Sequence, residues 1–135
     1  MDSPGDWVAA VAAVAAMLFV GVAMLHTLAA FGSPVGNHLW GADRQELPGL
    51  LRGASVVTVL GLTLAAMVVW GRAGRSSVAA WDDRLVGGLT WLLAVSLAAA
   101  AVACHSSHSR LERWVLAPAA AVAALLVALV AAAAG

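Results

Sequence analysis

The chain has 135 residues, of which 63% are hydrophobic and 10% are charged. A soluble domain is roughly half apolar and a quarter charged, so this composition excludes an ordinary soluble domain and predicts a protein of the lipid bilayer. Seven acidic side chains balance seven basic ones, and the zero net charge offers no electrostatic basis for binding nucleic acid. Cys104 is the only cysteine, so no disulfide can form within the chain.

The first two apolar segments each have the length of a membrane-spanning helix, which needs about 20 mostly apolar residues. The first covers residues 7–31, is interrupted by His26, and ends before the glycines and proline of GSPVG, which break a helix. Its N-terminal flank lacks positive charge, so we expect a retained span and not a cleaved signal peptide. The second covers about residues 48–70 and starts at Pro48, a residue suited to a first helical turn.

The third segment covers about residues 84–104, and the acidic side chains of Asp82 and Asp83 before it can cap the N-terminus of a helix. The fourth segment covers about residues 109–134. Four spans return the chain to the side of the membrane from which it started. The sequence therefore predicts an all-α, four-span transmembrane helix bundle that forms a single integral membrane domain over residues 1–135, with both termini on the same side.

The start of the fourth segment contains the spacing Ser109-x-x-Glu112 ahead of an apolar run. This spacing is typical of a capping box, in which each side chain accepts a hydrogen bond from the other residue's backbone amide. Pro118 lies further along the segment and lacks an amide hydrogen, so we expect it to kink the helix.

All four histidines belong to the side of the bundle that carries the first and third connections. His26 is near the end of the first span, His38 lies in the first connection, and His105 and His108 lie in or beside the third. Arginines near the span ends are almost equally divided between the two sides, so the positive-inside rule does not fix which side faces the cytoplasm.

His105 and His108 are candidates for metal binding because they are three residues apart. On a continuous helix their Cβ atoms would be about 5–6 Å apart on one face, which permits both imidazoles to bind one zinc, iron or copper ion. His26 is expected to approach across the bundle, as a further ligand or as one axial ligand of a haem, and His38 or Glu46 to complete the shell from the loop. The alternative is that the histidines lie at the membrane interface and hydrogen-bond to water and loop carbonyls.

His26 and Arg52 are candidates for a catalytic pair, because an ionisable side chain inside a membrane span indicates a functional site by default. A membrane enzyme would use His26 as a general base beside Arg52. The structural alternative is that His26 forms a local hydrogen bond. Arg52 would then reach the lipid headgroups or pair with Glu46 or Glu112.

Three segments of the sequence resemble a known family: GSPVGNHLWG, ELPGLLRGAS and SHSRLERWVLAP. The family consists of small bacterial four-helix integral membrane proteins of unknown function. Its members are similar in having a first connection with glycine, proline and Trp-Gly, a Leu-Pro before a second span with an early arginine, and Ser-x-x-Glu-Arg before a proline. The resemblance covers nearly the whole chain and implies a four-span protein of the bacterial plasma membrane, without supplying an activity or catalytic residues.

The sequence favours a small multi-pass membrane protein of unassigned activity that acts in the lipid bilayer through packing with a membrane protein partner or, as a homo-oligomer, with itself. The alternative is a membrane redox or catalytic protein that binds a metal ion or haem through the histidine cluster. A membrane enzyme based on His26 and Arg52 is the third interpretation.

Overall fold

The computed structural model describes residues 5–41, 45–74 and 81–133. Within these ranges the chain forms four long helices, a short 3-10 helix and a π-helical turn: α1 (Asp6–Ala30), η1 (Pro34–His38), α2 (Gly49–Arg72), α3 (Asp83–His105), η3 (Glu112–Leu116) and α4 (Ala117–Ala133). α1 packs mainly against α2 and α3 mainly against α4, so the bundle consists of two helix pairs.

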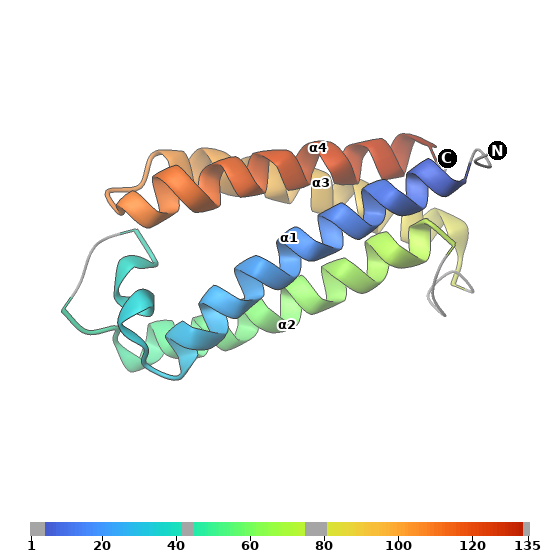
Figure 1. Ribbon diagram of the computed structural model, residues 1–135. Coiled ribbons are helices and arrows are strands. Elements are labelled where there is room, and N and C mark those ends of the chain that lie inside the picture. Colours follow the sequence, from blue (N-terminus) through green and yellow to red (C-terminus); the bar gives the residue numbers. More distant parts are fainter. Residues whose placement is uncertain (1–4, 42–44, 75–80, 134–135) are drawn as a thin grey trace.

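α1 starts and α4 ends at the same end of the bundle, which we call the terminal end (Figure 1). The opposite end carries η1 and η3, and we call it the connection end. This arrangement confirms the predicted all-α bundle of four helices with both termini on one side.

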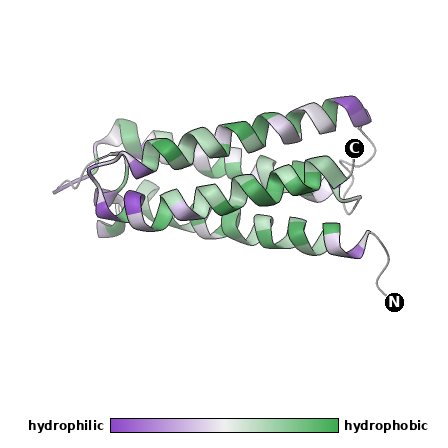
Figure 2. Ribbon diagram, turned by 90° about the horizontal axis from the view of Figure 1, so that it is seen from above, coloured by the Kyte–Doolittle hydropathy of each residue, from purple (hydrophilic) through white to green (hydrophobic). Residues whose placement is uncertain are grey.

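Each predicted span corresponds to a helix that is long and apolar enough to cross a membrane. The bounds of the first three helices differ from the predicted ones by one or two residues. The fourth candidate span is Glu112–Ala133, and residue 134 lies outside the described residues. Figure 2 shows hydrophobic residues along the helices and hydrophilic residues near the helix ends. The four helices are therefore compatible with a multi-pass membrane protein.

Local hydrogen bonds satisfy the polar side chains of these helices. Asp82 caps α3 as predicted, because its carboxylate accepts a hydrogen bond from the Leu85 amide at 3.0 Å. Hydroxyl groups within the helices donate to the carbonyl four residues earlier, which keeps them from facing lipid unpaired. Such hydroxyls belong to Thr58, Thr63, Thr90 and Ser96.

The fourth span begins with a widened turn, in the region where the sequence predicts a kink. Residues Glu112–Leu116 are π-helical, and α4 continues from Ala117. Pro118 has no amide hydrogen, and its ring crowds the carbonyl of Trp114 one turn earlier, so a widened turn accommodates both effects. This turn positions Glu112 in the interior of the protein, where the residue is buried.

Two clusters of buried apolar residues lie along the bundle. The cluster at the terminal end is built largely from small residues, and its most buried members include Ala12, Ala15, Val127 and Val130. Small side chains allow membrane helices to approach closely and to gain dispersion contacts. The second cluster lies at the connection end and consists of Ala29, Leu39, Leu47 and Leu116.

Candidate functional site

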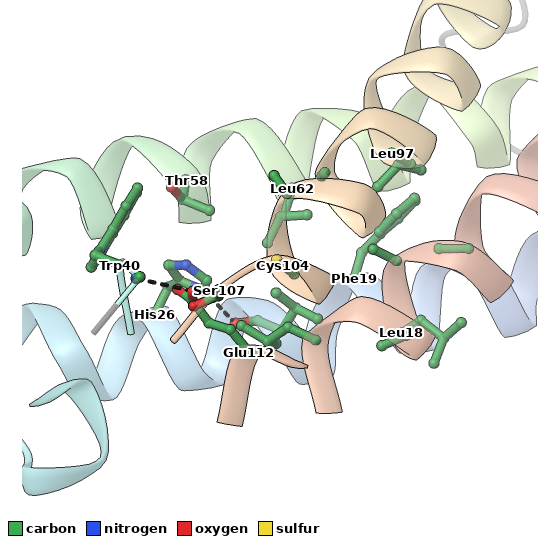
Figure 3. Close-up of a pocket in the computed structure, with 18 of the residues that line it drawn as sticks. Leu18, Phe19, His26, Trp40, Thr58, Leu62, Leu97, Cys104, Ser107 and Glu112 are labelled. Carbon is green, nitrogen blue, oxygen red and sulfur yellow. Dashed lines mark hydrogen bonds between the residues drawn. The ribbon is translucent and has the colours of Figure 1, made fainter. Parts of the chain in front are cut away.

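A cavity of about 630 Å³ lies at the connection end, and all four long helices contribute to its wall. Its polar and apolar parts are separated. Figure 3 shows His26, Trp40, Ser107 and Glu112 grouped at one end, and Leu18, Phe19 and Leu97 further along. The walls on α3 and α4 are formed largely by small residues, namely Ala100, Ala103, Ala119, Ala120 and Ala123. The cavity is partly open and therefore accessible from outside the protein.

The first connection folds back onto α1 through η1. Gly36 is buried there, and a Cβ atom at this position would lie 2.6 Å from the Cα of Ala29. Only glycine permits this close approach of the two backbones. Leu39 follows η1 and is fully buried, so the connection is anchored on the bundle immediately before Trp40.

Trp40 forms one wall of the polar end and has a left-handed backbone conformation, with a φ angle of 65°. A bulky residue adopts this conformation only where surrounding contacts impose it. The indole Nε1 donates a hydrogen bond to the Ser55 hydroxyl at 3.1 Å. The indole ring also meets the ring of His26 edge-on, with centroids 5.7 Å apart. These two contacts hold Trp40 between α1 and α2.

Glu112 links the third connection to the first. Its carboxylate Oε2 accepts a hydrogen bond from the Gly41 amide at 2.9 Å. The Ser109 hydroxyl donates to the His38 carbonyl, which makes a second link between the same two connections. Both bonds join residues 71 positions apart in the sequence, so they fasten the α1–α2 pair to the α3–α4 pair at the polar end of the cavity.

The predicted capping box is present only in part. The Glu112 amide points to the Ser109 hydroxyl at 3.5 Å, as expected for one half of the motif. The other half is replaced, because the Ser109 amide donates to the Ser107 hydroxyl at 3.0 Å. The carboxylate of Glu112 is therefore available to bind Gly41 across the bundle.

His26 is buried and lines the cavity. Its Nδ1 lies 3.0 Å from the carbonyl oxygen of Val22, one turn earlier in α1. A carbonyl oxygen only accepts, so Nδ1 carries a proton, and in the neutral ring with this tautomer Nε2 carries the lone pair. His26 therefore forms, through Nδ1, the local hydrogen bond that the sequence analysis gave as the structural alternative. The other nitrogen is left to interact with the contents of the cavity.

Arg52 packs at the end of α1, outside the described lining of the cavity. Its guanidinium packs against the backbone at the end of α1, because a Cβ atom on Gly32 would lie 2.8 Å from Nη2. Gly32 has a φ angle of 80°, which favours glycine. Arg52 is absent from the described residues that line the cavity, whereas His26 is among them. The assignment of these two residues to catalysis stays a prediction.

His105 and His108 face different cavities. α3 ends at His105, so the continuous helix that would place both imidazoles on one face is absent. His108 lines the main cavity, whereas His105 lines a separate groove of about 470 Å³ together with Arg113, Trp114 and Pro118. Among the described residues, the two cavities have no lining residue in common.

The remaining metal candidate, His38, has an exposed side chain at the end of η1. Within the part of the chain that the structure describes, no group of three or more His, Cys, Asp or Glu side chains is arranged to hold a metal ion. Metal or haem binding by His26, His38, His105 and His108 stays a prediction.

Sequence reasoning did not identify Trp40, Ser55 and Ser107 as parts of the site. Trp40 carried a signal, because a tryptophan between turn-forming glycines in a connection has to be anchored by tertiary contacts. The serines carried none, since a serine near a helix end is ordinary in any membrane protein.

No protein-family model, curated protein or solved structure matches the sequence. The resemblance to small bacterial four-helix membrane proteins therefore stays a prediction.

Proposed function

We propose that this protein is a multi-pass protein of the bacterial plasma membrane that binds a single-chain amphiphile in the cavity between its two helix pairs. The observation that carries the proposal is the division of the cavity into an apolar part and a polar end. Small-molecule sites are typically concave and mostly apolar, with a few polar groups that orient the ligand. A molecule with a hydrocarbon chain and a small polar head matches this division.

The size of the cavity supports a ligand with one chain. Its volume of about 630 Å³ falls within the range of roughly 300–1,000 Å³ that small-molecule sites occupy. At about 30 Å³ for each water-sized group, the space accommodates on the order of 20 non-hydrogen atoms. This number suits one hydrocarbon chain with a small head and is too small for a two-chain phospholipid.

The cavity persists because of the residues that surround it. Alanines on α3 and α4 leave space that leucine or phenylalanine would fill. At the polar end, the Glu112–Gly41 and Ser109–His38 hydrogen bonds connect the two helix pairs beside the small apolar cluster of the connection end. The empty space therefore follows from specific side chains, which supports a binding role.

Photocrosslinking tests the proposal. The protein would be reconstituted in phosphatidylcholine nanodiscs with a diazirine analogue of dodecanol, and adducts would be mapped by mass spectrometry. We expect adducts at cavity-lining residues, lost in Ala120→Phe and retained in Ala121→Phe. Ala120 lines the cavity and Ala121 lines the outer groove, so the pair provides a matched control on adjacent positions of α4.

Two results would contradict the proposal. Adducts spread evenly over the lipid-facing helix surfaces, with no change in Ala120→Phe, would indicate ordinary solvation by lipid. A cavity occupied by a helix of a second copy, detected as crosslinks between chains in place of amphiphile adducts, would favour the hypothesis that the protein acts through packing with itself.

A further inference from the structure

The polar end of the cavity presents hydrogen-bond acceptors to a ligand. His26 offers Nε2, which accepts a hydrogen bond in the neutral tautomer whose Nδ1 donates to the Val22 carbonyl. Glu112 offers its carboxylate, which has room for several hydrogen bonds and receives one from Gly41. Both residues are buried and line the cavity.

Several donors in the cavity wall are already used by the protein itself. The indole Nε1 of Trp40 binds the Ser55 hydroxyl. The Thr58 hydroxyl donates to Ala54, and the Ser106 hydroxyl donates to Val102. The Ser107 hydroxyl and the His108 ring also line the cavity and can donate to a ligand. A head that donates finds the carboxylate and the imidazole as acceptors.

The charge at the polar end of the cavity also favours a ligand head that donates hydrogen bonds. Among the described lining residues, Glu112 is the only Asp, Glu, Lys or Arg. Among the described residues, the Gly41 amide donates to this carboxylate, and one amide compensates less of the cost of burying a carboxylate than a cation does. Arg113 is adjacent in sequence, but its Nε and Nη2 donate to the Ser107 carbonyl at 3.2 and 2.9 Å and its side chain lines the outer groove.

We infer that the cavity selects a single-chain amphiphile with a primary ammonium head, bound by the Glu112 carboxylate and by Nε2 of His26. An ammonium group carries a positive charge and three donors, and an alkyl amine is protonated at neutral pH, as lysine is. A fatty acid of the same length is disfavoured, because its carboxylate would lie beside Glu112. The inference rests on the proposed amphiphile-binding function and adds the chemistry of the head.

The test compares three ligands that differ only in the head: dodecylamine, dodecanol and dodecanoate. Each would compete with the photoreactive dodecanol analogue in phosphatidylcholine nanodiscs at pH 7, at equal mole fractions in the membrane. We expect dodecylamine to compete about tenfold more strongly than dodecanol, the gain expected for a charge-assisted hydrogen bond, and dodecanoate to compete least.

The Glu112→Gln variant identifies the residue responsible. Glutamine keeps an oxygen that can accept from the Gly41 amide, and circular dichroism checks that the helices remain. We expect the preference for dodecylamine over dodecanol to disappear. Arg113→Gln is the matched control, and it should keep the preference because Arg113 faces the outer groove.

The outcomes separate the two proposals. If dodecylamine, dodecanol and dodecanoate compete equally in the unaltered protein, the cavity binds amphiphiles and the ammonium inference is wrong. The same holds if dodecanoate competes best. If none of the three competes, both proposals fail. These results come from the unaltered protein, so they decide the question even if Glu112→Gln does not fold.

Discussion

The terminal end and the connection end of the bundle are held together by different interactions. At the terminal end, fully buried small residues such as Ala12 and Ala15 let the helices pack closely, and valines of α4 join the same cluster. At the connection end, buried polar groups link the two helix pairs, with Ser109 bonded to His38 and Glu112 bonded to Gly41. The cavity lies between these polar links and the first cluster, whose members Phe19 and Ala123 also line it.

The comparison shows how a bundle of four apolar helices can keep an internal space. Apolar burial does not drive helix association in lipid, so close packing and hydrogen bonds remain as the main sources of cohesion. Close packing excludes a cavity, whereas hydrogen bonds between connections hold helix ends at a fixed separation. Changes in side-chain size should therefore destabilise the terminal end, and loss of polar contacts should destabilise the connection end.

Gly36→Ala should have the largest effect on stability. The added Cβ atom would lie 2.6 Å from the Cα of Ala29, so η1 must move away from α1 and carry Trp40 with it. We expect the free energy of unfolding to fall by about 3 kcal/mol, the upper part of the usual range for overpacking.

Gly53→Ala is the control. It has open space around it within α2, and it should raise stability by about 0.5–1 kcal/mol. Unfolding in detergent followed by circular dichroism measures both, and equal effects would contradict the close contact at Gly36.

Ala12→Leu should have the next largest effect, and it tests the terminal end. Ala12 is fully buried against the neighbouring helices, so a leucine forces them apart. We expect a loss of about 2 kcal/mol, as for overpacking of a tightly packed core. Ala10→Leu lies on the exposed face of the same helix and should leave stability nearly unchanged. A similar tolerance at both positions would show that the terminal end is loosely packed.

Ser109→Ala tests the polar links at the connection end. The substitution removes the donor to the His38 carbonyl and leaves that carbonyl without this bond. We expect the free energy of unfolding to fall by about 1–2 kcal/mol. Ser96→Ala removes only an exposed bond within α3 and should cost much less. The same detergent unfolding measurement applies, and a null result at Ser109 would mean that the two connections are not fastened through this hydroxyl.

Ala120→Phe should have the smallest effect on stability, although it blocks the proposed site. Ala120 borders the cavity, so the new ring enters existing space and does not displace a neighbour. We expect the free energy of unfolding to stay the same or to rise by about 0.5–2 kcal/mol, as for cavity filling. A loss comparable with that of Ala12→Leu would show that α4 is packed at this point.

The four helices were predictable from the sequence because bilayer thickness sets a minimum length for an apolar run. The distortion near Pro118 was also predictable in place, since the missing amide hydrogen acts locally. The kind of distortion was not predictable, because a kink and a π-helical turn both accommodate a proline. The pairing of His105 with His108 assumed a helix that continues, whereas α3 ends at His105.

The cavity itself left no signal in the sequence. Ala12 and Ala120 are both alanines inside apolar runs, yet one is packed at an interface and the other borders open space. Whether an alanine is packed at an interface or borders a cavity depends on the side chains that face it from another helix. The hydrogen-bond partner of the Glu112 carboxylate was not predictable for the same reason. Local spacing predicted the Ser109 amide, whereas the Gly41 amide donates to the carboxylate in the structure.

Equilibrium binding of dodecylamine to the reconstituted protein and to its Ala120→Phe and Ala121→Phe variants tests the central claim most directly. We expect the unaltered protein and Ala121→Phe to bind it with the same affinity, in competition with the photoreactive probe, and Ala120→Phe to lose that binding while remaining folded. Equal binding by all three proteins would contradict the claim that the space at the connection end is a ligand site.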